Sequence, residues 1–475
     1  MRAASLHVSP FSGSWYPDDP AELRTLLDRS FEQSEQRTGR FLPPRAAGFI
    51  VPHAGIIYSG TVASATYRAL RLLSPKRVVL LGFAHHGSAA GAWIADVEAF
   101  RTPLGELPVD REFAAALIAT GAFAPLEEDL LCDHSVEIQL PFLQYAVPSV
   151  AVVPVYASGL DAPARSAAAR ALATLAGPDT ALVASSDLTH FGRGFGYQPF
   201  PADEFAPDRL RELDESVLEA AGTLESGEFQ DVLRSTRATV CGVQPISLLL
   251  DTVRILSDAE EVFQETLDYQ TSGDITGDFR QSVSYAAAAY CPYHAFDLSR
   301  ADGEALLEAA RATLDLYLAT GERRPLAPRG DSPAFDRRTT AFVTLHSNGS
   351  LRGCVGRRTS TEPLSVLVPS LALSAALEDS RFDSVQPGET GIELEVSILS
   401  PFKRITNPDR FRVNEHGAML ESGYHRGLLL PQVATERGWH AGQFFDALAR
   451  KAGTIRDAYK HKGSRLYVFR AQIIR

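Results

Sequence analysis

The sequence predicts a mixed α/β protein with two folding units in tandem. In the first half, short apolar runs bounded by Gly or Pro alternate with helix-like stretches, which is typical of buried parallel strands and their crossover helices. In the second half, a hairpin signal and a strictly alternating strand indicate antiparallel pairing instead. We therefore expect an α/β unit with a central, largely parallel sheet flanked by helices, followed by an α+β unit.

Buried strands are expected in the first half near 47–51, 77–82, 150–155 and 181–185, with a closing strand at 282–290. The stretch 213–233 is acidic and amphipathic, which predicts a helix, and Gly222 and Gly227 are candidate breaks in it. This alternation of strands and helices predicts βαβ units with helices on both faces of the sheet.

The polar stretch 294–302 is predicted to link a first unit, 1–293, to a second unit, 303–475. The elements expected in the second unit are an amphipathic helix through 306–318, a hairpin over 341–351 that turns at Asn348-Gly349, a strand at 392–398, a helix at 441–452 that ends at Gly453, and a terminal strand at 466–469. Because the strand at 392–398 alternates apolar and polar residues, one face of its sheet is expected to meet water.

The composition is that of an ordinary globular protein and excludes some classes of function. Of the 475 residues, 45% are hydrophobic and 22% are charged, and the formal net charge of -12 argues against non-specific binding to nucleic acid. No apolar stretch reaches the length of a membrane span, and the first residues lack the apolar core of a signal peptide. The four cysteines form no C-x-x-C pair. We expect a cytoplasmic protein without membrane association.

Polar residues follow three of the predicted strands. His53 and His85 each come just after an apolar run, and Asp187 and His190 follow a third run. In an open α/β sheet, ligands bind beyond the carboxyl ends of the strands, and imidazole suits a transition metal. The sequence therefore predicts one polar cluster that can hold a metal.

Each of these residues has a structural alternative. A single histidine after a strand is more often a hydrogen-bonded structural residue than a ligand, and His86 competes with His85 for the same role. Asp187, after two serines, is also a candidate helix cap. Because no G-x-S-x-G elbow, P-loop or G-x-G-x-x-G loop is present, Ser-His-Asp hydrolysis and nucleotide binding are disfavoured.

A series of short motifs in the first half resembles the Memo family. In chain order these are Ser12–Pro17, Pro52–Gly55, Tyr58–Gly60, His85-His86, Thr102–Gly105, His134–Glu137, Leu140–Phe142, Ser185–Asp187 and Cys241-Gly242. The match runs through nearly all of residues 5–290. The resemblance implies a fold similar to that of the class III extradiol dioxygenases, which are non-haem iron enzymes. It also implies a metal site made of His53, His85 and Cys241, with Asp187 and His190 beside them.

The resemblance further implies roles for these residues. Fe(II) is the expected metal, and a thiolate in place of the dioxygenases' carboxylate ligand admits Cu or Zn as rivals. His190 is expected to act as an acid or base, and Asp187 to support it by orienting a ligand. Further candidates for lining the pocket are His86, His134 and Glu137. The substrate is expected to be a small organic molecule.

Residues 300–475 resemble the AMMECR family, an α+β fold with a smaller flanking subdomain. The motifs that carry this resemblance are Leu351–Gly356, Ala375–Phe382, Glu393–Ser397, Gly427–Val433 and Gly438-Trp439. Cys354, which follows Arg352 and lies between two glycines, is a candidate reactive thiol, because a nearby cation favours the thiolate and glycines let a substrate approach. The alternative is a buried cysteine in a tight turn, where the glycines serve conformation only.

Memo-like and AMMECR-like proteins resemble two components of a three-part set, AmmeMemoRadiSam, whose third member is a radical SAM protein. That protein is therefore an expected partner, since the chain lacks a Cys-x₃-Cys-x₂-Cys cluster of its own. Fusion raises the effective concentration of one unit at the other. The leading hypothesis is a metal-dependent oxidoreductase related to the class III extradiol dioxygenases. The second hypothesis is a non-catalytic metal-binding or peptide-binding adaptor that works with the radical SAM protein.

Overall fold

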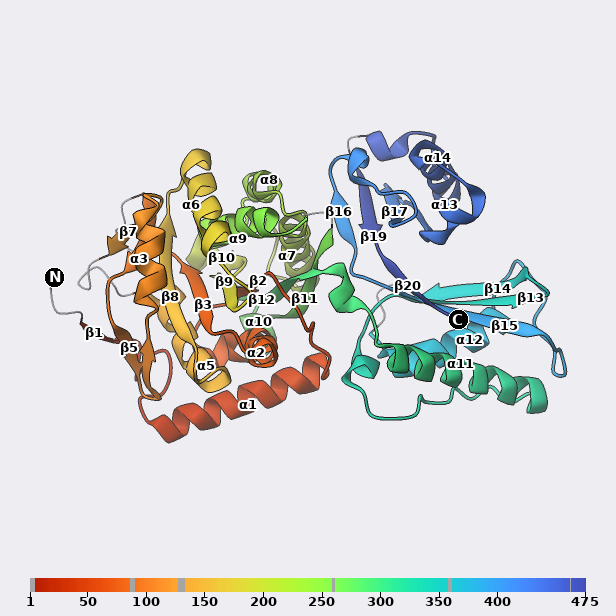
Figure 1. The fold of residues 1–475 in the computed structure, drawn as a ribbon, viewed down its shortest axis with the longest axis horizontal. Helices are drawn as coiled ribbons and strands as arrows, with labels where there is room; N and C mark the ends of the chain where they lie inside the picture. Colours follow the sequence, from red (N-terminus) through yellow and green to blue (C-terminus); the bar gives the residue numbers. More distant parts are fainter. Residues whose placement is uncertain (1–4, 86–89, 127–132, 259–260, 358–360, 462) are drawn as a thin grey trace. The chain divides into compact units, whose positions relative to one another are not determined.

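The computed structural model describes residues 5–85, 90–126, 133–258, 261–357, 361–461 and 463–475 (Figure 1). The chain divides into two compact units, one of Met1–Thr38 and Pro43–Ala295 and the other of Gly39–Leu42 and Phe296–Arg475. The division between Ala295 and Phe296 falls inside the stretch 294–302 that was predicted to link the units, and Leu298 of that stretch is buried in the hydrophobic core of the second unit. Each unit has a core of its own.

The N-terminal unit is built on a nine-stranded sheet with the order β10-β12-β2-β9-β3-β8-β4-β7, to which β11 adds by pairing with β12. Its strands are β2 (Gly48–Val51), β3 (Arg77–Gly82), β4 (Gly91–Ala95), β7 (Ala124–Leu126), β8 (Ala151–Ser158), β9 (Thr180–Ser185), β10 (His190–Gly192), β11 (Val262–Thr271) and β12 (Gln281–Pro292). A small separate sheet holds β1 (Leu6–Val8), β5 (Ala99–Thr102) and β6 (Gly105–Pro108).

The centre of the large sheet is parallel, as predicted. Strands β2, β9, β3 and β8 run in the same direction, whereas β12 pairs antiparallel with β2, and β4 with β8. All five strands predicted for this half are confirmed. The closing strand, β12, is longer than expected and lies inside the sheet. It has β2 on one side and pairs with β10 and β11 on the other.

Helices cover both faces of this sheet. They are α1 (Pro20–Thr38), α2 (Ile56–Leu73), α3 (Arg111–Ala119), α4 (His134–Glu137), α5 (Gln139–Ala146), α6 (Ala162–Leu175), α7 (Ala206–Gly222), α8 (Ser226–Thr236), α9 (Val243–Leu256) and α10 (Ser272–Thr276). Figure 1 shows α1, α2 and α5 on one face and α3, α6 and α9 on the other. The predicted helix at 213–233 is indeed divided: α7 ends at Gly222, whereas Gly227 lies inside α8.

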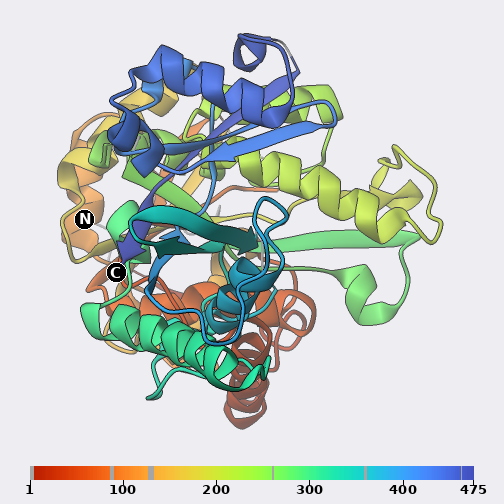
Figure 2. The same cartoon turned by 90° about the vertical axis from the view of Figure 1, so that its right-hand side faces the viewer.

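The C-terminal unit contains two four-stranded sheets, with the orders β14-β13-β15-β20 and β16-β19-β17-β18. Its strands are β13 (Ala341–Ser347), β14 (Ser350–Arg357), β15 (Ile392–Leu399), β16 (Lys403–Ile405), β17 (Gly417–Ser422), β18 (His425–Leu429), β19 (Ser464–Phe469) and β20 (Ala471–Ile474). Its helices are α11 (Arg300–Thr320), α12 (Leu364–Leu377), α13 (Gln432–Arg437) and α14 (Ala441–Ala452). Figure 2 draws α11 in green and α14 in dark blue.

The local signals of the second half are confirmed. Asn348 and Gly349 turn the β13–β14 hairpin with positive φ values of 51° and 75°, which is the conformation that a two-residue turn needs. Gly453 ends α14 in the left-handed region. The strand predicted at 466–469 is β19, but the last strand is β20, which the sequence analysis did not include.

The expectation that one face of the strand at 392–398 meets water holds only at the start of β15, where Glu393 is exposed. Glu395 and Ser397, which alternate with the apolar residues of β15, are both buried. Gln432, at the start of α13, donates a hydrogen bond to Glu395 at 3.3 Å, and Arg475 pairs with the same carboxylate. The part of the polar face beyond Glu393 therefore lies inside this unit, where other parts of the same unit cover it.

Among the described residues, no helix combines the length and the apolarity that crossing a bilayer requires.

Candidate metal centre

Three side chains from separate segments converge at the carboxyl edge of the parallel strands. His53 and His85 follow β2 and β3, and Cys241 comes just before α9. Two imidazole nitrogens and the sulfur, one atom from each residue, all lie within 4.8 Å of one another. The structure thus brings together the trio that the sequence analysis nominated.

His53 is buried and held in a fixed orientation. Its Nδ1 lies 3.0 Å from the Ser185 hydroxyl, which also accepts a hydrogen bond from Gln139 at 3.1 Å. Its Nε2 lies 3.1 Å from the Cys241 sulfur. Burial, together with the charges of His134 and His85, lowers the pKa of His53 well below its ordinary value. The ring is therefore neutral at neutral pH, which is the form that binds a metal.

His85 is oriented by a carboxylate. Its Nδ1 lies 3.0 Å from both oxygens of Asp133, and its backbone N–H donates to Asp133 at 2.6 Å. Burial raises the pKa of Asp133, but the hydrogen bonds from His85 outweigh it and hold the pKa at about 2. An ionised carboxylate on Nδ1 fixes the tautomer of the ring and leaves Nε2 as the ligand nitrogen.

Cys241 is positioned by the loop that follows β9. The backbone N–H of Asp187 donates to its sulfur at 3.2 Å. The neighbouring Gly242 packs against this loop so closely that a Cβ there would lie 2.4 Å from the Cβ of Ser186. Burial, and then the charge of Asp187, raises the pKa of the Cys241 thiol above its ordinary range. Metal binding must therefore displace a proton from this sulfur.

The donor set fits a transition metal. Nitrogen at about 2.1 Å and sulfur at about 2.3 Å from one ion are separated by about 3.1–3.6 Å for angles of about 90–110°. The 3.1 Å between His53 Nε2 and Cys241 Sγ falls at the lower end of this range. Two imidazoles and a thiolate suit iron, copper or zinc, and three protein ligands leave positions open for other molecules.

Asp187 and His190, the predicted catalytic pair, lie beside the trio. The Asp187 carboxylate accepts hydrogen bonds from the backbone N–H groups of His53 at 2.8 Å and Ala54 at 3.3 Å. Burial raises the pKa of Asp187 to about 6, against the opposing effect of His190. Asp187 thus holds the backbone of one ligand by its side chain and the sulfur of another by its N–H.

The tautomer of His190 is fixed by two carbonyl groups. Its Nδ1 lies 3.1 Å from the backbone oxygens of both Leu188 and Thr239. Carbonyl oxygens only accept hydrogen bonds, so Nδ1 carries the proton and Nε2 of the neutral ring is the basic nitrogen. The ring is partly exposed.

The remaining pocket candidates have different positions. His134 stacks on His85 with ring centroids 4.0 Å apart, and on Trp15 at 4.3 Å. Glu137 is buried, and its Oε1 lies 3.0 Å from the ring of His7. It is not among the residues that line the cavity described next. His86 lies outside the described residues.

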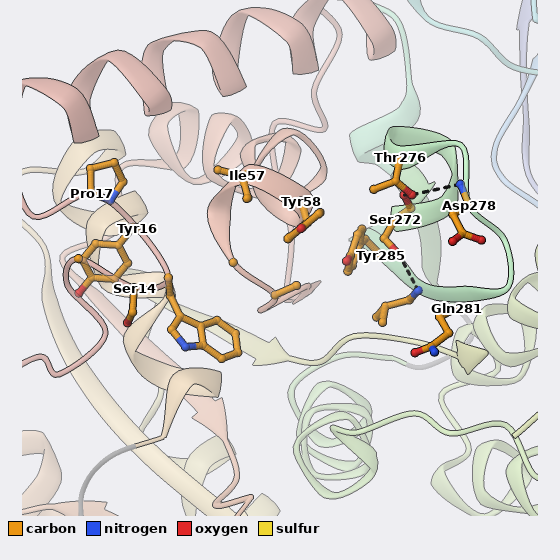
Figure 3. A pocket seen from close by; sticks show the side chains of 15 residues that line it. Ser14, Tyr16, Pro17, Ile57, Tyr58, Ser272, Thr276, Asp278, Gln281 and Tyr285 are labelled. Atoms are coloured by element: carbon orange, nitrogen blue, oxygen red, sulfur yellow. Dashed lines mark hydrogen bonds between the residues drawn. The ribbon is translucent and has the colours of Figure 1, made fainter. Parts of the chain in front are cut away.

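A cavity of about 770 Å³ adjoins this stack of rings. Trp15 and Ala54 are in its wall, and Figure 3 shows Tyr58 from α2 facing it between Tyr16 on one side and Tyr285 on the other. Hydroxyl, amide and carboxylate groups of Ser272, Gln281 and Asp278 supply its polar part. The column Trp15–His134–His85 therefore connects the wall of the cavity with a metal ligand.

Sequence reasoning missed Asp133, although a signal for it was present. An Asp before a short helix is typical of an N-cap, and the Asp133 side chain does accept from the Ser135 N–H at 2.8 Å. The same carboxylate also orients His85. Nothing in the sequence near Asp133 indicates this second contact, which joins residues 48 positions apart.

An Asp133→Asn variant is expected to bind metal about 10–100-fold more weakly, as is typical when an outer-shell partner is lost. The amide can still cap α4, but it is a neutral and weaker acceptor for the His85 ring. Competition with a chromophoric chelator measures the affinity. Asp161→Asn, the same change at the N-cap of α6, is the control, and an unaltered affinity in Asp133→Asn would contradict the role given to this carboxylate.

The candidate thiol of the second half is partly exposed, on β14. Arg352, the cation expected to act on this thiol, forms its hydrogen bonds with other groups. Its guanidinium pairs with Glu389 at 2.9 Å and donates to the Asp383 carbonyl at 2.7 Å. The cation that the sequence suggested as the partner of Cys354 is thus bound to a carboxylate and a carbonyl group instead.

The fold and the site define an α/β protein with a candidate mononuclear metal centre at the carboxyl edge of a parallel sheet. The chain belongs to the Memo-like protein family, whose model matches residues 9–289. The model of the AMMECR1 family matches residues 307–474, so both predicted resemblances are confirmed, in the predicted order.

Relatives with similar sequences cover one half of the chain. A MEMO1 family protein of Methanopyrus kandleri is 32% identical over 294 residues, which are 59% of this chain and 96% of that protein. A memo-1 homolog of Caenorhabditis elegans is 30% identical over 285 residues, 58% of this chain and 80% of its own. A solved structure of an uncharacterized protein from Pyrococcus horikoshii is 32% identical with a TM-score of 0.35, over 37% of this chain and 92% of that one.

Proposed function

We propose that the Memo-like unit is a metal-dependent oxidoreductase, related to the class III extradiol dioxygenases, that acts on a small organic molecule. The observation that supports this most is the convergence of His53, His85 and Cys241. Fe(II) is the proposed metal, because two imidazoles and an anionic ligand with open positions are typical of non-haem iron sites. When bound, it supplies Lewis-acid and one-electron chemistry.

The chain's own residues have separable tasks in this proposal. Ser185 orients the ring of His53 through Nδ1, and Asp133 holds the ring of His85 in the tautomer that leaves Nε2 as the ligand nitrogen. Asp187 holds the backbone of His53 and the sulfur of Cys241. His190 presents Nε2 as a base, because its Nδ1 is bound to two carbonyl groups. The cavity beside Trp15 supplies an apolar, aromatic wall that binds the organic part of the substrate and excludes water.

A His190→Gln variant tests the catalytic part of this proposal. Loss of a general base typically costs about 10²–10⁴-fold in rate, so turnover is expected to fall by that factor while metal content stays at the wild-type level. Iron-loaded wild-type and variant proteins are incubated with a metabolite extract in air, and mass spectrometry identifies compounds that only the wild type consumes. His294→Gln, an exposed histidine in the same unit, is the matched control.

The outcomes separate the two hypotheses. A compound that is consumed in a metal-dependent and His190-dependent way supports the enzyme. If iron binds and no compound is consumed, the non-catalytic adaptor is favoured instead, and a radical SAM protein becomes the first partner to test.

A further inference from the structure

The cavity beside the metal centre follows β12 toward a second hollow. Gln281, Val283 and Tyr285, which are alternate residues of β12, all line the cavity, as is expected of side chains on one face of a strand. Figure 3 shows Gln281 and Asp278 at one end of the cavity and Tyr16 at the other. A second hollow, of about 490 Å³, shares both Gln281 and Asp278 with the cavity. A molecule that is longer than the cavity can therefore extend into this second hollow.

The strand register places His190, the proposed base, on the side of the sheet where the cavity lies. In the pairing of β10 with β12, His190 is opposite Val283, and Gly192 is opposite Gln281. Directly opposed residues of neighbouring strands point to the same face. Arg193, three residues after His190, lines the second hollow. The base and a cation of the second hollow thus belong to one short segment beside the cavity.

The backbone on both sides of Arg193 is held against β12. Gly192 has a φ of +125°, and a Cβ there would lie 2.3 Å from the backbone oxygen of Arg280. A Cβ on Gly194 would lie 2.5 Å from the side-chain oxygen of Gln281. Glycine permits so close an approach because it has no Cβ. Arg193 is therefore anchored next to Gln281, the residue that the cavity and the second hollow share.

The second hollow carries an uncompensated positive charge. Two guanidinium groups line it, those of Arg193 and Arg280, together with the carboxylate of Asp278. Arg280 donates to both oxygens of Asp278, at 2.9 and 2.7 Å, so these two charges compensate each other. Arg193 donates to the side-chain oxygen of Gln198 at 3.4 Å, and no carboxylate among the described residues pairs with it. A guanidinium in this state can bind a carboxylate through two parallel N–H groups.

We propose that the substrate of the Memo-like unit is an amphiphilic carboxylate, whose apolar part fills the cavity and whose carboxylate is bound by Arg193. This inference rests on the proposed function and names the substrate class. One uncompensated positive charge matches the single charge of a carboxylate better than the nearly double charge of a phosphate monoester. Arg193 selects and orients the substrate in this arrangement, and the chemistry is left to the metal centre and His190.

The test compares acids with their neutral amides on the whole chain. The probes are phenyl-substituted fatty acids of increasing chain length, each paired with its amide, and calorimetry measures their dissociation constants. The protein is stripped of metal, because a carboxylate would otherwise also bind the ion. At least one acid is expected to bind about two- to five-fold more tightly than its amide, which is the range of an exposed ion pair. Arg193→Gln should abolish this difference by weakening the acid alone.

Arg170→Gln is the matched control, because Arg170 is an exposed arginine of the same unit, on α6, and lies outside both hollows. It should change the binding of neither probe. Arg193→Lys keeps the charge without the planar fork, so it should retain part of the difference between acid and amide. Added salt is expected to reduce that difference in the wild type.

Asp278→Asn is expected to act in the opposite direction. The amide oxygen can still accept the hydrogen bond from the Arg280 N–H, which is 2.9 Å long in the structure, but the guanidinium of Arg280 loses its compensating charge. The second hollow then holds two uncompensated cations, and the acids should bind about two- to five-fold more tightly than they bind to the wild type. The amides should be unaffected.

The proposal is overturned if no acid of the series binds the wild type more tightly than its amide, or if Arg193→Gln and Arg170→Gln alter acid binding alike. Because binding is measured without turnover, this result is separate from that of the proposed function. Arg193-dependent binding without any His190-dependent turnover would contradict the enzyme alone. A substrate that wild type and Arg193→Gln consume equally well would contradict the present inference alone.

Discussion

A Cys241→Ser variant is expected to lose tight metal binding while keeping its fold. The hydroxyl of serine can still accept the Asp187 N–H bond, but it does not ionise as a thiol does and is a poorer ligand for a borderline-soft metal. The loss of affinity should exceed the roughly 10–100-fold that outer-shell changes cost. Metal content after anaerobic loading and gel filtration, followed by chelator competition, measures the effect.

The matched control for this variant is Cys354→Ser, the same substitution in the other unit. It should leave metal content unchanged. A further measurement is the release of protons on metal binding. Burial raises the pKa of the Cys241 thiol, so the thiol must lose its proton when the metal binds. Wild type is expected to acidify a weakly buffered solution on metal addition more than Cys241→Ser does. Equal metal affinity in the two proteins would mean that the sulfur is not a ligand.

Most of the N-terminal fold could be predicted because its signals are local. Buried parallel strands are continuous apolar runs, and β2, β3, β8 and β9 were found from such runs alone. The topology rule for open α/β sheets then placed His53 and His85 at one edge. In this half the local sequence pattern agrees with the global fold, and such agreement allows the fold to be predicted from the sequence.

The rest of the site depends on contacts between distant segments. Cys241 precedes a helix on another part of the chain, so it was nominated by family resemblance and not by any local pattern. Asp133 was missed because its capping role is visible in sequence and its contact with His85 is not.

In the second unit, the alternation of β15 was interpreted correctly as one apolar and one polar face, but on the polar face only Glu393 is exposed, whereas Glu395 and Ser397 are buried. A period of two distinguishes the faces of a strand and does not reveal what covers each face. Arg352 was a natural partner for Cys354 by spacing, yet folding binds it to Glu389. Arg381, which donates a hydrogen bond to the Cys354 carbonyl oxygen, lies 27 positions away from Cys354.

A Gly353→Ala variant is expected to destabilise the C-terminal unit by about 3 kcal/mol or more, at the upper end of what overpacking costs. A Cβ at this position would lie 2.1 Å from the backbone oxygen of Ala375 in α12, and neither backbone can move aside cheaply. For a unit of this size, that loss lowers the melting temperature by roughly 6–12 °C. Differential scanning calorimetry of the whole chain measures the transition.

Gly227→Ala supplies the control, because a Cβ there meets open space in α8 and alanine is the better helix former. It should leave the melting temperature unchanged or raise it slightly. Metal content should stay at the wild-type level in Gly353→Ala, since the two units have separate cores. Wild-type stability in Gly353→Ala would show that this glycine is not needed for packing, and a role in admitting a reagent to Cys354 would then be the better explanation of its place in the motif.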